Sequence, residues 1–193
     1  MKIGITGGIG SGKSYICDKL RRLGFPVYSC DYEAKQLMVC DACIIDGVKR
    51  LVGDKAYTQS GEIDRAVIAN FVFSGADNVR QMNAIVHPRV KAHFEAWARQ
   101  CNAEFVFMES AILFESGFDD VVDKTVAVYA PKNVRLLRAM RRDHATEAQI
   151  VSRMNSQMDE DEKRGLADFV IVNDSVADVD GQIQNMLDAL SLN

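Results

Sequence analysis

The sequence predicts an α/β fold, with a parallel β-sheet as the middle of three layers and a helical lobe inserted between two of its strands. Three observations support this prediction. Five short apolar segments are separated by segments of helical periodicity, a glycine-rich turn joins the first apolar segment to the first helical one, and a long stretch has helical periodicity with few strand signals. Continuous apolar strands that are separated by helices are typical of parallel sheets covered on both faces.

The first two strands are expected close to the start of the chain. Residues 1–6, MKIGIT, form a short apolar segment, and residues 14–23 then carry three apolar residues at helical spacing. Gly24 ends this helix, and residues 27–30 predict a second strand that leads directly to Asp31.

Residues 32–97 predict the inserted helical lobe, because polar and apolar residues follow helical periods there. The turn residues within it are Gly53, Gly61 and Gly75.

Three further strands are expected after the lobe, at residues 104–108, 124–129 and 168–172. Residues 133–142 predict a helix, and a strongly charged stretch at 143–164 follows it. A closing amphipathic helix is indicated by the spacing of Val179, Ile183, Met186, Leu187 and Leu190.

Composition and charge narrow the class of protein. The 193 residues are 48% hydrophobic and 26% charged, as in ordinary globular proteins. The net charge of −4 argues against a nonspecific nucleic-acid binder or a membrane-surface binder. No stretch approaches the roughly 18 apolar residues of a spanning helix, and the first residues lack a signal-peptide pattern. We therefore expect a cytoplasmic protein.

The five cysteines fit that expectation, because they are odd in number and scattered among apolar neighbours. Cys40 and Cys43 do form a C-x-x-C pair, which is compatible with a redox pair or half a zinc site. No second pair follows, however, and the histidines His87, His93 and His144 offer no matching ligand spacing. Reduced thiols are the favoured interpretation.

The glycine-rich turn carries the strongest functional motif. Residues 7–14, GGIGSGKS, match G-x-x-x-x-G-K-[ST] between a predicted strand and a predicted helix, which indicates a phosphate-binding loop. Glycines let backbone amides approach phosphate oxygens, Lys13 is expected to bridge the β and γ phosphates, and the Ser14 hydroxyl to coordinate Mg²⁺. The residues expected to bind ATP here are Gly8, Gly10, Ser11, Gly12, Lys13, Ser14 and the Tyr15 amide. The alternative is a turn that only joins strand to helix, where four glycines would be costly.

A phosphate loop is compatible with a switch GTPase, a motor ATPase or a small-molecule kinase. The N-K-x-D tetrapeptide of guanine specificity is absent, and a D-x-x-G at residues 178–181 follows the last strand, where it could not sense a γ-phosphate. The chain is also short for a motor module. A kinase remains the best prediction.

Two acidic residues follow predicted strands, at the edge where open α/β sheets bind ligands. Asp31 is the candidate base that takes the proton of an acceptor hydroxyl, with the alternative that it caps a helix starting at Tyr32. Glu109 is the candidate partner of the Mg²⁺ hydration shell, with a plain surface carboxylate at the strand end as the alternative.

Arginines recur along the helix expected at residues 133–142. Arg135, Arg138 and Arg142 lie at i, i+3 and i+7, so one stripe of the helix would present three guanidinium groups suited to phosphate oxygens. We interpret residues 135–164 as a mobile lid that brings arginine onto ATP and excludes water, with a solvated basic face as the alternative.

Several motifs together resemble one family. They are TGGIGSGKS at residues 6–14, an Asp ending the second strand, HP at 87–88, LFE at 113–115, RRD at 141–143, and SQM, EKR and AD between 156 and 168. In this order along nearly the whole chain they resemble dephospho-CoA kinases. The resemblance implies that ATP phosphorylates the ribose 3′-hydroxyl of dephospho-CoA to give coenzyme A and ADP, with Mg²⁺ as the metal. It also implies a nucleotide-binding core (1–31, 100–134 and 165–193), a dephospho-CoA-binding lobe (32–99) and a lid (135–164).

The resemblance assigns roles residue by residue. Asp31 would be the base, and the acceptor-side residues would be Arg65, His87 and Glu115; the ATP-side residues would be Arg138, Arg142 and Asn173. A packed, hydrogen-bonded histidine is the alternative for His87. Ser29 stands where the family often has a first Asp, and Ala111 where a proline is usual.

Two rival functions remain open at this point. A nucleoside or nucleotide kinase shares the loop, the lid and the base, whereas a noncatalytic regulator would bind ATP and release no ADP. ATP and dephospho-CoA are the expected partners, without nucleic acid or membrane, and the sequence does not fix the oligomeric state.

Overall fold

The computed structural model describes residues 1–192, and the backbone alone of Ala76. The chain divides into two compact units, one formed by Met1–Tyr28 together with the segment from Cys101 onward, and the other by Ser29–Gln100. Each unit is described by itself below.

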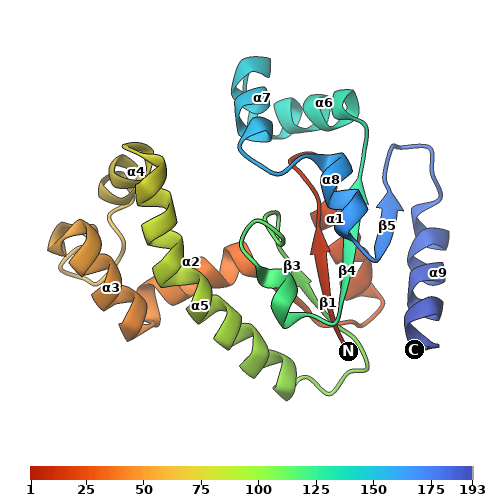
Figure 1. Cartoon of the computed structure of the whole chain (residues 1–193), viewed down its shortest axis with the longest axis horizontal. Helices are drawn as coiled ribbons and strands as arrows, with labels where there is room; N and C mark the ends of the chain where they lie inside the picture. Colours follow the sequence, from red (N-terminus) through yellow and green to blue (C-terminus); the bar gives the residue numbers. More distant parts are fainter. Residues whose placement is uncertain (193) are drawn as a thin grey trace. The chain divides into compact units, whose positions relative to one another are not determined.

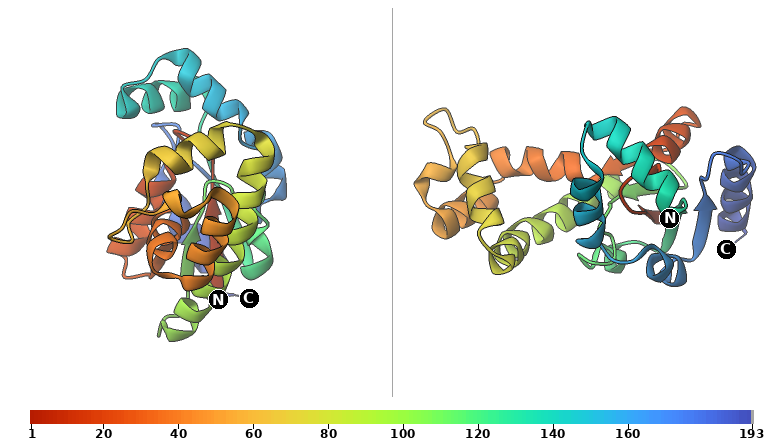
Figure 2. Two further views of the ribbon diagram at one scale, coloured as in Figure 1. Left: turned by 90° about the vertical axis from the view of Figure 1, so that its left-hand side faces the viewer. Right: turned by 90° about the horizontal axis from the view of Figure 1, so that it is seen from above.

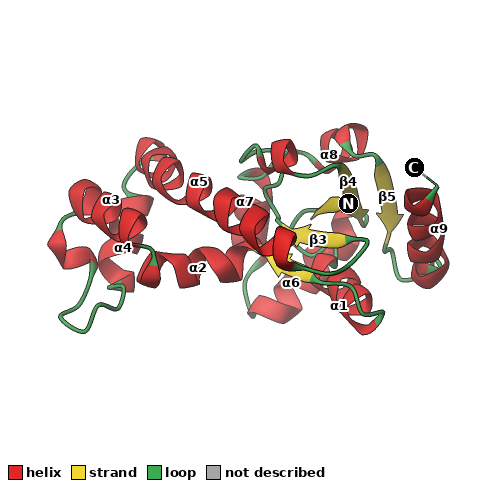
Figure 3. Ribbon diagram, turned by 90° about the horizontal axis from the view of Figure 1, so that it is seen from below, coloured by secondary structure: helices red, strands yellow, loops and turns green. Residues whose placement is uncertain are grey.

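Five strands form one sheet, coloured yellow in Figure 3. They are β1 (Lys2–Thr6), β2 (Val27–Ser29), β3 (Val106–Glu109), β4 (Lys124–Tyr129) and β5 (Phe169–Val172), in the order β2-β3-β1-β4-β5. Strand β1 pairs in parallel with β3 and β4, and β4 pairs in parallel with β5. The carboxyl ends of these strands therefore meet at one edge, as the α/β prediction requires.

The helices of this unit are α1 (Lys13–Arg22), α6 (Lys132–Asp143), α7 (Glu147–Asn155), α8 (Glu160–Leu166) and α9 (Val179–Ser191) (Figure 1). A 3-10 helix, η2, spans Phe118–Val121. The charged stretch that follows α6 folds largely as α7 and α8. A capping box in which Thr146 and Gln149 bond each other's backbone amides starts α7, and Asp159 caps α8.

The alternation of side chains along β1 sorts its residues between the two faces of the sheet. Ile3 and Ile5 are fully buried in a cluster that includes Ile16 and Leu20 of α1 and four residues of α9. Gly4 lies between them on the other face, where a Cβ atom would press against Leu113. The apolar core therefore holds α1 and α9 against the sheet, and residues 7–12 connect β1 to α1.

The unit Ser29–Gln100 is built from α2 (Cys30–Cys40), α3 (Ala42–Val52), α4 (Arg65–Phe73) and the long α5 (Ala76–Gln100). Figure 2 shows these four helices, coloured orange to yellow-green, as one bundle. Asp41 and Asp64 cap α3 and α4 by accepting backbone N–H bonds, and α5 continues through Pro88. The predicted turn residues Gly53 and Gly61 have positive φ angles outside these helices.

Candidate nucleotide-binding site

The phosphate loop runs from the end of β1 at Thr6 to the start of α1 at Lys13. Gly10 and Gly12 have φ angles of 79° and 95°, which side chains rarely adopt. A Cβ atom on Gly10 would overlap the backbone of Arg135, and one on Gly12 would overlap the Asn173 amide. No side chain caps the first turn of α1, so this helix N-terminus presents amides and its dipole toward the loop.

Two side-chain amides from distant segments hold the loop. The Asn173 Nδ2 atom donates to the Ser11 carbonyl at 2.9 Å, and Asn173 is 8% exposed. The Ile9 N–H donates to Gln157 Oε1 at 3.1 Å, and the Ile9 side chain packs against a buried cluster that contains Ile150 and Met154. The loop is therefore braced both from the end of β5 and from the segment between α7 and α8.

Ser14 and Glu109 meet at the sheet edge. The Ser14 Oγ atom donates to Glu109 Oε1 at 3.0 Å, because Glu109 ends β3 in register with Ile5 of β1. Burial, reinforced by the negative charge of Glu109, raises the pKa of the nearby Cys17 thiol to about 12. A hydroxyl and a carboxylate fit a hard cation such as Mg²⁺. Within the described residues no cluster of three or more His, Cys, Asp or Glu side chains could hold a metal without further ligands.

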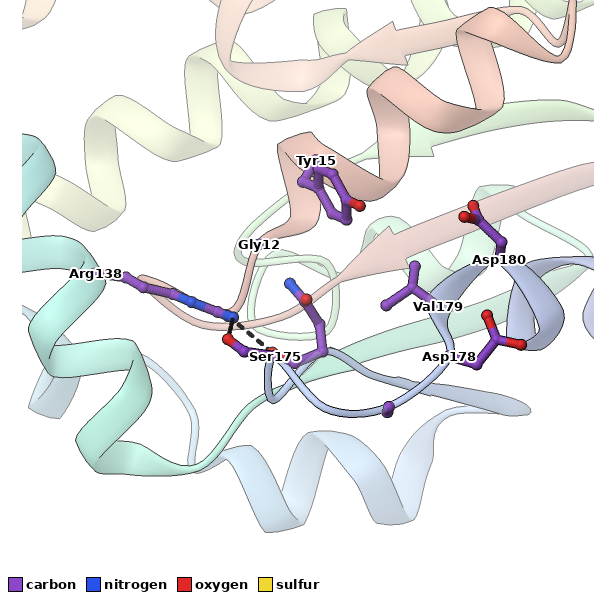
Figure 4. A pocket seen from close by; sticks show the side chains of 9 residues that line it. Gly12, Tyr15, Arg138, Ser175, Asp178, Val179 and Asp180 are labelled. Atoms are coloured by element: carbon purple, nitrogen blue, oxygen red, sulfur yellow. Dashed lines mark hydrogen bonds between the residues drawn. The ribbon is translucent and has the colours of Figure 1, made fainter.

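A cavity of about 580 Å³ opens beside the loop (Figure 4). It is lined by Gly12, Tyr15, Arg138, Asn173, Ser175, Ala177, Asp178, Val179 and Asp180. The Arg138 guanidinium donates to the Asn173 carbonyl at 2.8 Å and to Ser175 Oγ at 2.7 Å. Ser175 holds a φ of 80°, an unusual backbone conformation for a residue other than glycine. The volume and its position next to Gly12 suit the base and ribose of a nucleotide.

Lys19 braces the wall of this cavity. Its Nζ atom lies 2.6 Å from Asp180 and 5.0 Å from the centre of the Tyr15 ring. Hydrogen bonds to Asp180 and Tyr15 raise the Lys19 pKa. The sequence analysis assigned only the Tyr15 amide to the site and did not identify Lys19, Ser175 or Asp180.

The three arginines of α6 that the sequence predicts on one stripe have different surroundings. Arg135 is buried, its Nε atom donates to the Ala130 carbonyl, and its Nη1 atom lies 3.8 Å from Glu160. Arg138 lines the cavity, whereas both Arg142 contacts go to Asp143. A solvated basic face does not describe Arg135, which is only 8% exposed, whereas the Arg142 side chain is 62% exposed.

Arg142 belongs to an ion-pair cluster with Asp143 and Arg153. Asp143 accepts from Arg142 at 2.7 Å and from Arg153 at 2.6 Å. These two guanidinium groups hold the pKa of Asp143 far below its usual range. The cluster ties the end of α6 to α7.

The candidate base lies in the helical unit. Asp31 is exposed in the first turn of α2, directly after β2, where its charge suits the positive end of the helix dipole. The alternative that Asp31 caps a helix starting at Tyr32 is wrong, because α2 begins at Cys30 and Ser29 holds the N-cap position. Strand β2 ends at Ser29, one residue earlier than the predicted segment 27–30, and the N-cap position moves with it.

Two more expected acceptor-side residues lie in the helical unit. Arg65 is exposed at the first position of α4. His87 is half-buried in α5, where burial and the positive charge of Lys91 lower its pKa below 6.5.

Glu115 lies in the other unit, and its carboxylate is already engaged. Its Oε1 atom accepts from the Met158 N–H at 2.9 Å and lies 3.0 Å from Lys163 Nζ. Lys163 is fully buried and also donates to the Ala111 carbonyl at 2.9 Å. The sequence analysis quoted the segments around Gln157 and Lys163 as family motifs without giving either residue a role.

The fold and the loop geometry together define a class. A parallel sheet with the strand order observed here, with a glycine loop feeding a helix that starts with lysine and serine, is the architecture of P-loop kinases. A crystal structure of TT1252 from Thermus thermophilus shares this fold with a TM-score of 0.82 and 32% sequence identity, covering 100% of this chain and 96% of that one.

The comparisons then identify the family. The dephospho-CoA kinase family model matches residues 1–178. A dephospho-CoA kinase of Bacteroides fragilis is 43% identical over 189 residues, which cover 97% of this chain and 91% of that protein. A solved dephospho-CoA kinase from Campylobacter jejuni is 26% identical with a TM-score of 0.68, covering 99% of this chain and 96% of that one. The chain belongs to the dephospho-CoA kinase family.

Among the described residues, none of the helices combines the length and the apolar character needed to cross a bilayer.

Proposed function

We propose that this chain transfers the γ-phosphoryl group of ATP to the ribose 3′-hydroxyl of dephospho-CoA, giving coenzyme A and ADP. The observation that carries the proposal is the braced phosphate loop, in which Asn173 and Gln157 hold the backbone of Ser11 and Ile9. Membership of the dephospho-CoA kinase family supports the choice of acceptor.

The nucleotide binds along the loop and in the adjoining cavity. The loop amides from Gly8 to Ser14 face the phosphates, and Lys13 spans the β and γ groups. Arg138 uses two of its guanidinium donors on Asn173 and Ser175, so its other N–H groups can bond phosphate oxygens.

Ser14 and Glu109 are the residues that would hold Mg²⁺, since their oxygen atoms already lie 3.0 Å apart at the end of β3. A magnesium ion bound with the phosphates supplies positive charge that neutralises the β and γ oxygens. Glu109 then orients the Ser14 hydroxyl through the hydrogen bond that it accepts.

The chemical step is an in-line displacement at the γ-phosphorus. The acceptor O3′ forms the new P–O bond as the bond to ADP breaks, and Asp31 takes the proton of the hydroxyl. Asp31 is exposed in the first turn of α2, so its carboxylate is accessible to the acceptor hydroxyl.

The remaining assignments follow the same proposal. Residues 32–99 bind dephospho-CoA, with Arg65 and His87 as contacts, and residues 135–164 form a lid that carries Arg138 and Arg142. The contacts of Glu115 with Met158 and Lys163 favour a role other than contact with the acceptor. The acidic net charge favours small-molecule substrates over nucleic acid. The free cysteines favour a location in the cytoplasm.

An ADP-release assay with Mg-ATP tests this function. We expect ADP to form with dephospho-CoA and not with adenosine or AMP. The mass of dephospho-CoA should increase by that of one phosphoryl group. A 3′-deoxyribose analogue of dephospho-CoA is the matched control and should remain unmodified. ADP formed with adenosine or AMP alone would make the chain a nucleoside or nucleotide kinase, and ATP binding without ADP from any acceptor would make it a noncatalytic regulator.

A further inference from the structure

Lys163 is the fully buried lysine of the nucleotide-binding unit, and its environment is unusual for a lysine. The side chain is 1% exposed and comes from the short, highly charged helix α8. Burying an ammonium group is costly unless charge and hydrogen bonds compensate it. Glu115 at 3.0 Å supplies the charge, and the Ala111 carbonyl at 2.9 Å supplies a second acceptor.

The partners of Lys163 place it between two parts of the site. Ala111 and Glu115 belong to the turns that follow Glu109, the residue bonded to Ser14. The Glu115 Oε1 atom also accepts from the Met158 N–H at 2.9 Å. The Glu115–Lys163 pair therefore ties the segment after β3 to both ends of the stretch from Met158 to α8.

Gln157, the residue before Met158, is one of the two side chains that hold the phosphate loop. Gln157 Oε1 accepts the Ile9 N–H at 3.1 Å, and the side chain of Ile9 packs with the apolar residues of α6 and α7. A backbone amide in such a loop must keep one orientation if its neighbours are to point at phosphate oxygens. The position of Gln157 depends in turn on the backbone of Met158, which Glu115 fixes.

We propose that Glu115 and Lys163 are positioning residues for the nucleotide side of the site: their buried pair fixes the segment that carries Gln157, which holds the Ile9 amide and keeps the phosphate loop in its binding conformation. Glu115 therefore acts on ATP binding through Lys163 and Met158, and it is not a contact of dephospho-CoA. The inference rests on the proposed function only for the identity of the acceptor.

The first measurement is binding of a nonhydrolysable ATP analogue, by calorimetry, to the full chain with Mg²⁺. Gln157→Ala removes one hydrogen bond from a half-buried side chain, so we expect the dissociation constant to rise by about 5- to 10-fold. Lys163→Met and Glu115→Gln should each raise this dissociation constant too. Because the two residues act as one pair, the double variant should bind the analogue no more weakly than the weaker-binding single variant. Lys163→Arg keeps the charge and the donors and should restore most of the affinity.

The second measurement separates the two substrates in the ADP-release assay. We expect Gln157→Ala, Lys163→Met and Glu115→Gln each to raise KM for ATP. KM for dephospho-CoA should stay within about twofold of its value in the unmodified protein. Glu162→Gln, at an exposed neighbour of Lys163, is the matched control and should change neither constant.

The opposite pattern would overturn the proposal. If Glu115→Gln raises KM for dephospho-CoA alone, and Lys163→Met does not reproduce that change, Glu115 is an acceptor contact. If Lys163→Met does not fold, Gln157→Ala still decides, because unchanged analogue binding in that variant contradicts the role of Gln157. Failure of dephospho-CoA as a substrate would refute the proposed function without affecting the analogue series.

Discussion

The side chains assigned to the nucleotide and those assigned to the acceptor differ in how the protein holds them. On the nucleotide side, Asn173, Arg138 and Ser14 each bond another part of the same unit, at 2.7–3.0 Å. On the acceptor side, Asp31 and Arg65 are exposed, and neither side chain forms a hydrogen bond or ion pair within the described part of the chain. If the proposed assignments hold, the fold holds these nucleotide-side groups in place more firmly than it holds Asp31 and Arg65.

That difference has an energetic consequence. Groups already held in place lose little freedom when a ligand arrives, whereas exposed side chains must be ordered by the ligand itself. Substitutions on the nucleotide side should therefore disturb binding and rate together. Substitutions on the acceptor side should separate the rate from ATP affinity.

The largest effect is expected when Lys13 is replaced. Lys13→Ala should depress ATP affinity and rate together, by roughly 10³-fold in kcat/KM for ATP, because the lysine meets charge on the β and γ phosphates. Steady-state ADP release and analogue calorimetry measure both quantities.

Asp31→Asn should instead lower kcat by roughly 10²-fold or more, the range of a lost general base, while analogue affinity stays within about twofold. The side chain keeps its size, and its exposed position makes a folding defect an unsuitable explanation. Unchanged turnover would remove Asp31 from the role of base, and a parallel loss of ATP affinity would contradict the contrast between the two sides.

A smaller effect is expected at Arg65. Arg65→Ala should raise KM for dephospho-CoA by about 10-fold, because Arg65 is exposed and should contribute near the lower end of the roughly 1.5–3 kcal/mol of a hydrogen bond to a charged group. KM for ATP should not change. Arg50, exposed on α3, provides the control: Arg50→Ala should leave both constants unaltered. Equal increases in KM for dephospho-CoA would indicate that positive surface charge attracts this substrate in general and that Arg65 makes no specific contact.

The smallest effect concerns pH. The lowered pKa of His87 means that, between that value and 6.5, the unfolded chain binds a proton that the folded chain does not. Stability should therefore fall as the pH drops from 7.5 through 6.5. Water partly screens the half-buried imidazole, so the unmodified protein should lose on the order of 1 °C more in Tm by pH 5.5 than His87→Gln does.

Thermal unfolding of both proteins at the two pH values measures that difference. Identical pH slopes would show that burial of the neutral imidazole contributes nothing. Adding dephospho-CoA sharpens the comparison, because a contact between its phosphates and His87 would favour the charged imidazole and reduce or reverse the slope.

Much of the fold follows from local pattern. The five strands and the closing helix lie within about two residues of the segments that periodicity indicated. Helix α2 begins at Cys30 and not at Tyr32, so Asp31 does not hold the cap position. Asn173 was expected on the ATP side, and it lines the cavity next to Gly12 of the phosphate loop. Arg135 was expected on one stripe with Arg138 and Arg142, yet it is buried near Glu160, because the side of a helix that faces the protein depends on what packs against it.

The sequence by itself determined the phosphate loop, because backbone conformation there depends on which residues are glycine and on a strand and a helix that adjoin in the chain. Only the tertiary structure decided what holds that loop. Ile9 and Gln157 are 148 positions apart, and Ser11 and Asn173 are 162 apart. The run Glu160–Arg164 has the composition of a solvated helix, yet Lys163 in it is buried with Glu115. Periodicity describes neighbours along the chain, whereas the partner of a buried charge is set by which segments the fold brings together.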